Sequence, residues 1–230
     1  MVKMGILCGH QEILQGLAGA RSDGKTTPKT EAPVGPAHTA VAPVPTSPKM
    51  LIKDAPPPLG SEMLVPASVW TSVTTDAWMV QRLLALYFCW EYPIFASLSK
   101  DYFVKDFCEG RARYCSSILV NSLLSMGSCF STSSLVGSDG QQASSDLFFN
   151  ETVRLLEANQ GRQDLTTVQA LGIMSLRQLS CGKDLESYYY SGQSIRMAIE
   201  MGTNCSDGVY GESESAVRAA TFWGAYSLDQ

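Results

Sequence analysis

The chain has 230 residues, of which 45% are hydrophobic and 17% charged, with a formal net charge of -5. This apolar content is enough for a packed core. The negative net charge excludes a protein whose whole surface attracts nucleic-acid phosphates. The charge is unevenly divided: residues 1–75 carry 6 basic and 5 acidic groups, and residues 76–230 carry 11 and 17.

Targeting and membrane-spanning signals are absent from the sequence. The first 20 residues interrupt a short apolar stretch with polar side chains, which does not fit a secretory signal. The longest later apolar run, ILVNSLLSMGSCF, is broken by Asn121 and by serines. Seven cysteines, an odd number scattered among apolar neighbours, predict reduced core thiols in a soluble intracellular protein. They are Cys8, Cys89, Cys108, Cys115, Cys129, Cys181 and Cys205.

Prolines mark the first 75 residues as a separate segment. Ten of the eleven lie between Pro28 and Pro66, among Ala, Thr, Ser and Val without hydrophobic periodicity. Such a segment buries too little apolar surface to offset the entropy lost on ordering it. We therefore predict a disordered tail and linker over residues 1–75, and a folded domain over residues 76–230.

Three helices are predicted first in this domain, over residues 76–93, 100–110 and 114–131. Asp76 is the expected N-cap of the first helix, and Pro93 is expected to end it. Apolar residues recur at helical spacing on the third helix, at Leu119, Leu123, Met126 and Phe130.

Small polar residues over 131–145 predict an exposed loop, and a fourth helix is predicted over residues 145–161. Two further helices follow over 164–182 and 184–202, with Asp164 and Asp184 as expected N-caps and Gly182 as the left-handed residue that ends the first of them. The apolar face of the second is predicted to comprise Tyr188, Gly192, Ile195, Ile199 and Gly202. Glycine and serine on such faces lower helix propensity, so close approach of a neighbouring helix is expected to compensate.

The last predicted helix begins near Ser213 or Ser215 and runs to the end of the chain. It has no terminating Gly, Asn or Pro, although it contains Phe222, Trp223 and Tyr226. No hairpin signal separates alternating apolar runs. We predict an all-α protein, a multi-helix bundle or orthogonal helical array that is incomplete at its C-terminus and leaves these aromatic rings partly exposed.

Histidine usage restricts the chemistry that the domain can perform. The only two histidines, His10 and His38, lie in the predicted tail, so a Ser-His-Asp or Cys-His device has no base in the helical domain. Phosphate-binding glycine motifs and Cys-x-x-Cys pairs are also missing. The acidic residues Asp101, Asp106 and Glu109 alternate with lysines, as on a solvated helix face. We predict no enzyme activity and no catalytic, cofactor or metal site in this chain.

Two charged residues lie among apolar neighbours near the end of the chain, Arg196 and Asp229. One hypothesis is that Arg196 meets Asp229 or a nearby carbonyl in a desolvated pair that fixes the last two helices. The alternative is an arginine whose stem packs while its guanidinium reaches water.

The last three predicted helices resemble the middle homology region of fungal binuclear-zinc-cluster transcription factors, the fungal-specific transcription factor domain. The segments that carry the resemblance are TTVQALGIMSLRQL, YYYSGQSIRMAIEMG and VRAATFWGAYSLDQ. The resemblance covers about residues 80–230. Its principal motif residues are Gln169, Ala170, Gly192, Arg196, Ala198, Gly202, Arg218, Phe222, Trp223 and Asp229. The chain departs from the family pattern at Thr203, Asn204, Ala219, Ala220 and Gln230.

This resemblance implies a nuclear transcription regulator whose helical domain controls activity. The family's six-cysteine DNA-binding module is missing, so the chain is expected to be a fragment, with zinc and DNA bound only by an absent segment. An effector or a protein is the expected partner of the helical domain, a homodimer is a further expectation, and no membrane is involved. Two rival interpretations are a helical adaptor, which lacks the expected 34-residue repeat, and an enzyme with a helical pocket built on Tyr188, Tyr189 and Tyr190.

Overall fold

The computed structural model describes residues 59, 65–131, 138–159, 161–203 and 210–230, with the side chains of the helix over 138–158 described from Ser144 onward. Those from 59 to 229 lie in one compact unit. The predicted disordered tail falls almost entirely outside the described residues. The described unit nevertheless extends further toward the N-terminus than the predicted boundary at residue 76.

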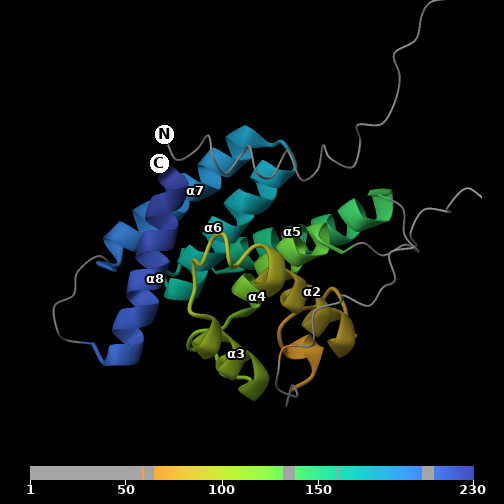
Figure 1. Ribbon diagram of the computed structural model, residues 1–230, viewed down its shortest axis with the longest axis horizontal. Coiled ribbons are helices and arrows are strands. Elements are labelled where there is room, and N and C mark those ends of the chain that lie inside the picture. Colours follow the sequence, from red (N-terminus) through yellow and green to blue (C-terminus); the bar gives the residue numbers. More distant parts are fainter. Residues whose placement is uncertain (1–58, 60–64, 132–137, 160, 204–209) are drawn as a thin grey trace, which may run out of the picture. The chain divides into compact units, whose positions relative to one another are not determined.

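The described part of the chain is all-α, as predicted, and contains no β-strand. In chain order the described residues form a short 3-10 helix and seven α-helices, and Figure 1 labels the α-helices. Their bounds are η1 Ala67–Val69, α2 Ala77–Trp90, α3 Lys100–Glu109, α4 Ser117–Cys129, α5 Ser138–Ala158, α6 Leu165–Ser180, α7 Asp184–Glu200 and α8 Glu212–Asp229. No helix within these described ranges has the length and apolar character needed to cross a membrane.

Local sequence signals explain where several helices begin and end. Asp76 accepts hydrogen bonds from the backbone N–H of Trp78 and Met79, at 2.9 and 3.1 Å, and so caps α2 as predicted. Asp164 caps α6 in the same way. Gly182 follows that helix with a φ of 71°, which only glycine adopts without strain. The cap of α7 differs from the prediction, because Lys183 is the N-cap and Asp184 is the first residue of the helix.

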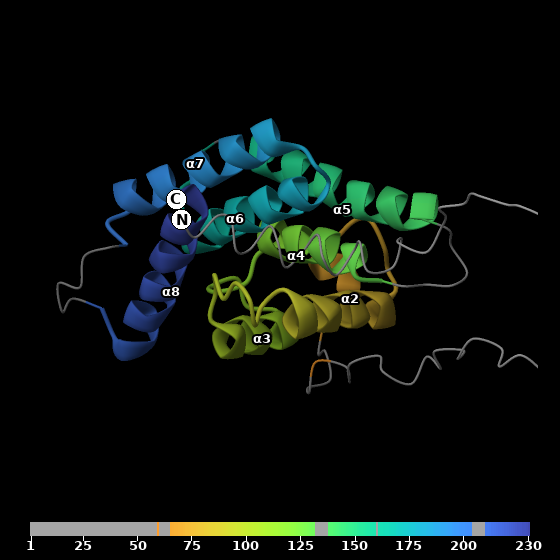
Figure 2. The same ribbon diagram turned by 45° about the horizontal axis from the view of Figure 1, so that its top comes forward.

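Helices α4 and α6 form the centre of the unit. Each is buried over almost its whole length, α4 from Ile118 to Ser128 and α6 from Leu165 to Gln178. Helix α4 packs against α2, α5 and α6, and α6 packs in addition against α7 and α8, as Figures 1 and 2 show. A Cβ on Gly127 of α4 would lie 2.2 Å from the carbonyl oxygen of Leu83 in α2. The two helices therefore approach more closely than any other residue would permit.

The segment before α2 belongs to the fold rather than to a linker. Trp70 is buried, and its indole Nε1 donates a 3.1 Å hydrogen bond to the carbonyl of Phe107. The hydroxyl of Thr71 donates to Asn121 Oδ1 at 2.7 Å, and Asn121 Nδ2 donates to the Trp70 carbonyl at 3.0 Å. Amino-acid composition does not reveal these buried hydrogen bonds, because the predicted domain boundary at residue 76 depends on proline content alone.

Other predictions are wrong. Helix α5 begins at Ser138, inside the predicted loop over 131–145, because its small polar residues lack apolar periodicity but do not prevent a helix. The part of that loop over 132–137 lies outside the described residues. Asp106 is not on a solvated face: it is buried, and its Oδ2 accepts a 2.7 Å hydrogen bond from the Tyr114 amide.

The cysteines are thiols in the part of the chain that the structure describes, but they do not all lie in the core. Cys108 and Cys115 are buried, Cys129 and Cys181 are half-buried, and Cys89 is exposed. Cys8 and Cys205 lie outside the described residues.

Candidate functional site at the junction of helices α6, α7 and α8

The ten predicted motif residues come from three consecutive helices and the turn after α7. Helix α6 packs against both α7 and α8, and α7 packs against α8. Helix α6 provides Gln169 and Ala170, α7 and its C-terminal turn provide Gly192, Arg196, Ala198 and Gly202, and α8 provides Arg218, Phe222, Trp223 and Asp229. The sequence motif thus corresponds to one helix junction.

Small side chains allow α6 and α7 to approach. The hydroxyl of Ser194 donates to the carbonyl of Val168 at 2.8 Å, and Ser175 Oγ lies 3.0 Å from Ser187 Oγ. A Cβ on Gly172 would lie 3.1 Å from Cδ1 of Leu228 in α8, so close helix approach compensates for that glycine as expected. Gly192 behaves differently, because no atom lies within 4 Å of the position its Cβ would take.

The predicted apolar face of α7 is largely wrong, since only Ile195 of its five members is buried. Tyr188 is 58% exposed and Ile199 is 56% exposed. The side chains that face the core are mostly small, and the buried set is Ser187, Ser191, Ser194, Ile195 and Ala198. Tyrosine at these positions would hold the helices apart. The close approach of α6 and α7 therefore requires the face of α7 that carries the smaller side chains.

Helix α8 is attached to α6 by a buried chain of hydrogen bonds. Gln169 Nε2 donates to the hydroxyl of Thr221 at 2.7 Å, and that hydroxyl donates to the Val217 carbonyl at 2.8 Å. A Cβ on Gly224 would lie 2.8 Å from Cα of Ser97, so α8 also touches the backbone between α2 and α3. Ala198 is fully buried beside Ala225, and Ala170 is fully buried in the main core.

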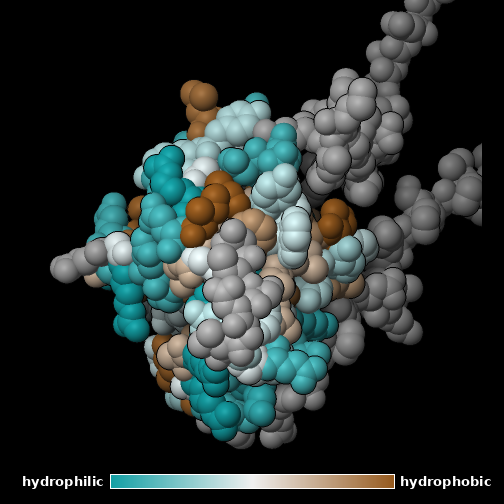
Figure 3. All heavy atoms as spheres, turned by 90° about the vertical axis from the view of Figure 1, so that its left-hand side faces the viewer, coloured by the Kyte–Doolittle hydropathy of each residue, from teal (hydrophilic) through white to brown (hydrophobic). Residues whose placement is uncertain are grey.

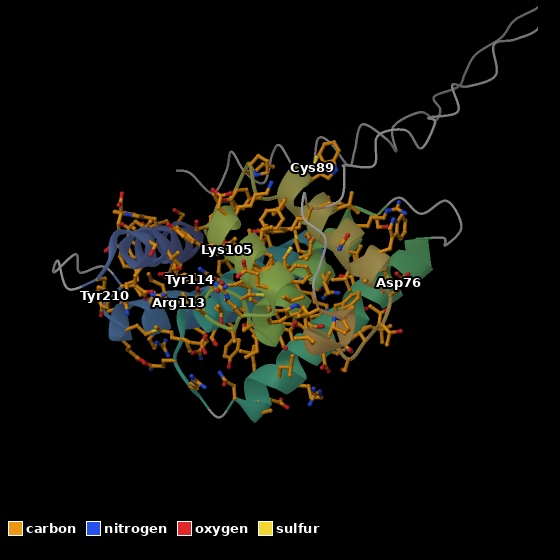
Figure 4. The ribbon with its side chains drawn as sticks, turned by 90° about the horizontal axis from the view of Figure 1, so that it is seen from below. Asp76, Cys89, Lys105, Arg113, Tyr114 and Tyr210 are labelled. Atoms are coloured by element: carbon orange, nitrogen blue, oxygen red, sulfur yellow. The ribbon has the colours of Figure 1, made fainter. Side chains whose placement is uncertain are left out.

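A cluster of charged and aromatic residues holds the N-terminal half of α8. The guanidinium of Arg218 lies 4.0 Å from the ring centre of Tyr210, and its Nε lies 3.4 Å from Oε1 of Glu214. Glu214 Oε2 accepts hydrogen bonds from Tyr114 Oη at 2.9 Å and from Arg113 Nη2 at 3.1 Å. Figure 4 shows Arg113, Tyr114 and Tyr210 near one another, far from Asp76.

The electrostatics of this cluster centre on the Glu214 carboxylate. Partial burial acts to raise the pKa of Glu214, but the hydrogen bonds from Tyr114 and Arg113 outweigh it and lower the pKa. Sequence reasoning missed Glu214, although its spacing of four residues from Arg218 was a usable signal.

The predicted Arg196–Asp229 pair is not present. Both residues are exposed. Water therefore solvates the two charges, as the alternative interpretation of Arg196 expected. Gly202, which follows the C-cap of α7, has a φ of 62° and ends the helix in the left-handed conformation.

Three rings form an aromatic surface on α8, defined here by Phe222, Trp223 and Tyr226. Trp223 is 61% exposed, Tyr226 is 41% exposed and Phe222 is half-buried, so the predicted partial exposure is confirmed. Their ring centres are 5.4 to 6.1 Å apart. Figure 3 views the side on which α7 and α8 lie in Figure 1 and shows hydrophobic patches within a largely hydrophilic surface.

Sequence reasoning also missed a buried polar network between α5 and α6. Arg177 is 1% exposed, and its Nε donates to Ser145 Oγ at 3.1 Å and its Nη1 to Gln178 Oε1 at 2.6 Å. Its Nη2 forms an ion pair with Asp146, and the guanidinium lies 4.7 Å from the ring centre of Phe149. An isolated arginine in the apolar run GIMSLRQL was the signal that could have found it.

Metal-binding geometry is not found among the described residues, where no three His, Cys, Asp or Glu side chains are grouped to hold an ion. A binuclear zinc cluster needs six cysteines with two Cys-x-x-Cys pairs, and the seven cysteines of this sequence contain no such pair, so the chain's own residues do not fit that group.

Comparison with known proteins places these features in context. Residues 84–230 match the family described as the fungal specific transcription factor domain. The chain is 39% identical over 169 residues to the nitrogen assimilation transcription factor nirA of Emericella nidulans, covering 70% of this chain and 19% of that protein.

Two further relatives show the same partial coverage. The identity is 37% over 176 residues to the nitrogen assimilation transcription factor nit-4 of Neurospora crassa, covering 72% of this chain and 16% of that protein. It is 32% over 171 residues to the notoamide biosynthesis transcriptional activator notL' of Aspergillus versicolor, covering 71% and 27%. No solved structure matches the chain.

Proposed function

The chain belongs to the fungal specific transcription factor domain family, and we propose that it serves as a transcription regulator in which the helical unit controls activity without catalysis. The match over residues 84–230 carries the proposal. DNA recognition would belong to a zinc-cluster segment outside these residues. The site of action would be the nucleus.

The names of the relatives support this division of labour. Each of the three is named as a transcription factor or activator, and the chain spans 19%, 16% and 27% of their lengths. The two at 39% and 37% identity are both named for nitrogen assimilation, which supports nitrogen assimilation genes as the class of target.

The charge of the helical part supports a controlling rather than a DNA-binding role. Residues 76–230 carry 11 basic and 17 acidic groups, a balance of -6. A net charge of that sign repels the phosphate backbone, so this part of the chain does not favour binding to DNA. An effector, a protein partner or a second copy of the chain would act on this unit.

A reporter assay with the whole chain tests the proposal. The 230-residue chain is fused to a DNA-binding domain of unrelated origin that has no activating or repressing function alone. Reporter transcription is then measured in a fungal host on preferred and on non-preferred nitrogen sources. We expect the fusion to change transcription relative to the DNA-binding domain alone, and the change to depend on the nitrogen source.

The controls separate the two parts of the proposal. A change that is equal on every nitrogen source keeps the regulator and removes the nitrogen assimilation role. Transcription equal to that of the DNA-binding domain alone contradicts the controlling role. In a gel-shift assay at physiological salt the unfused chain should leave DNA unshifted, and a shift would contradict the division of labour.

A further inference from the structure

Two cysteines lie at the ends of neighbouring helices in the centre of the unit. In α4, Ser125 Oγ donates to the carbonyl of Ser145 in α5 at 3.1 Å, and in α6, Arg177 Nε donates to the hydroxyl of the same Ser145 at 3.1 Å. Cys129 follows Ser125 by four residues, and Cys181 follows Arg177 by four residues. Each cysteine therefore lies one helical turn further along the same helix face. The two helices therefore bring these side chains to one place.

The contacts of the thiols agree with this geometry. Cys129 Sγ lies 3.5 Å from the hydroxyl of Ser145 and 3.6 Å from the carbonyl of Ser125. Cys181 is close enough to Cys129 to raise the pKa of that thiol. Cys129 is the last residue of α4 and Cys181 is the C-cap of α6, and both residues are half-buried rather than enclosed in the core.

We propose that Cys129 and Cys181 are a reversible redox site, which a hydroperoxide converts into a disulfide between the ends of α4 and α6. One thiol attacks the peroxide, its S–O bond forms as the O–O bond breaks, and sulfenic acid and an alcohol or water are produced. The second thiol then displaces the sulfenic oxygen, which leaves as water with the thiol proton. The two electrons of the dithiol thus reduce one hydroperoxide.

The surroundings of Cys129 act on its pKa. The neighbouring Cys181 and, after it, burial raise the pKa of Cys129, while the hydroxyl of Ser145 and the guanidinium of Arg177 oppose the rise. The influence of one thiol on the other agrees with their placement at adjacent helix ends.

The other described cysteines offer internal comparisons. Cys108 is 6% exposed and Cys115 is fully buried, so peroxide is excluded from both. Cys89 is exposed on α2 and provides a matched accessible thiol outside the cluster (Figure 4). In a reducing compartment, disulfides of this kind are transient and serve as sensors rather than as permanent braces.

The disulfide would alter the unit in a defined way. It would close the chain between residues 129 and 181, fastening α5 and α6 onto α4 around the polar network of Arg177. Cross-links that close long loops raise the free energy of the unfolded chain. Oxidation should therefore raise the melting temperature, and reduction should restore it.

Peptide mapping of the whole chain tests the proposal. The reduced protein is treated with hydrogen peroxide, unreacted thiols are alkylated, and the digest is analysed by mass spectrometry. We expect a linked Cys129–Cys181 peptide pair lighter by two hydrogens, loss of that pair on treatment with dithiothreitol, and a higher melting temperature. C129S and C181S should abolish the temperature rise, and C89S should retain it.

Several results would overturn the proposal. One is peroxide modification of Cys89 with no linked Cys129–Cys181 peptide. Another is the same yield of linked peptide in urea as in the folded chain, since the pairing would then not depend on helix geometry. A third is a temperature rise that persists in C181S. If the serine variants do not fold, peptide mapping of the unaltered chain, in buffer and in urea, still tests the proposal. It shows whether the Cys129–Cys181 link forms and whether it depends on the fold.

Discussion

Helices α4 and α8 are both parts of one compact unit, yet different forces hold them. Helix α4 is buried from Ile118 to Ser128 and packs against three helices, mainly through apolar side chains and in part through buried hydrogen bonds of Asn121 and Ser125. Helix α8 buries only Val217, Thr221, Gly224 and Ala225. Phe222 and Leu228 pack against the core while partly buried, and the other contacts of α8 are hydrogen bonds, glycine approaches and ion pairs at its edge. Apolar burial scales with area, whereas exposed polar contacts contribute little each. We therefore expect α8 to open at a lower free energy than the α4 region.

The largest effect should come from removing Arg177 in the centre. Its guanidinium is buried, and Arg177→Ala would remove its hydrogen bonds to Ser145 and Gln178 and open a cavity. The loss should be about 4 kcal/mol of unfolding free energy. Urea denaturation measures it.

The matched control for that change is Arg154→Ala. Arg154 pairs with Glu151 on the outside of α5, so its removal should leave the urea midpoint nearly unchanged. Equal shifts for the two alanine variants would contradict a buried role for Arg177.

Gly127→Ala should have the next largest effect. The new methyl group would lie 2.2 Å from the backbone oxygen of Leu83, and backbone cannot turn aside as a flexible side chain can. Helices α2 and α4 would have to separate, at a cost of about 2.5 kcal/mol. A thermal melt should show one transition at lower temperature.

Gly224→Ala sharpens the comparison, because it creates a similar clash in α8. The methyl group would lie 2.8 Å from Cα of Ser97. We expect faster amide hydrogen exchange along α8, with protection in α4 and α6 almost unchanged. An equal loss of amide protection in all helices would contradict this comparison, because it would show that α8 opens together with α4.

Sequence patterns predicted the parts of the fold that depend on local chemistry. The caps at Asp76 and Asp164 and the left-handed Gly182 act within a few residues of themselves, and each is confirmed. The buried face of α7 depends on which side chains let α6 come close, and periodicity favoured Tyr188 and Ile199 over the serines that actually pack.

The missed site residues share a different cause. Arg177 and Glu214 have partners 31 and 100 residues away in Asp146 and Tyr114, and tertiary packing alone brings them together. Asp106 is similar, because its burial follows from a turn that returns Tyr114 to α3. Charge alternation along one helix cannot reveal such contacts. The family motif located the α6–α7–α8 junction but not the bonds within it.

A smaller effect is expected where α8 meets the charged cluster. The pKa of Glu214 is lowered from its ordinary 4.5, so its contribution to stability is complete above that pH and disappears as the pH falls through the lowered value. Glu214→Gln should lower the unfolding free energy by about 1 kcal/mol or less at pH 7 and flatten its dependence on pH between about 5 and 3. Urea melts across that range measure it, with exposed Glu212→Gln as the control. If the unfolding free energy of Glu214→Gln depends on pH as that of the unaltered chain does, Glu214 does not contribute to the loss of stability in acid.

The smallest effect concerns two glycines with open surroundings, Gly192 within α7 and Gly202 in the turn after it. No atom lies within 4 Å of the Cβ position of Gly192 or of Gly202, but only Gly202 has a positive φ, of 62°. Gly192→Ala should therefore stabilise the protein by about 0.5 kcal/mol through helix propensity. Gly202→Ala should destabilise it by about 1 kcal/mol, because an L side chain is strained in the left-handed region. Thermal melts of the two variants separate the effect of backbone conformation from the effect of packing. If both melting temperatures shift in the same direction, the surroundings of α7 are packed differently from those described. Helix α7 would then be held as α4 is, rather than as α8 is.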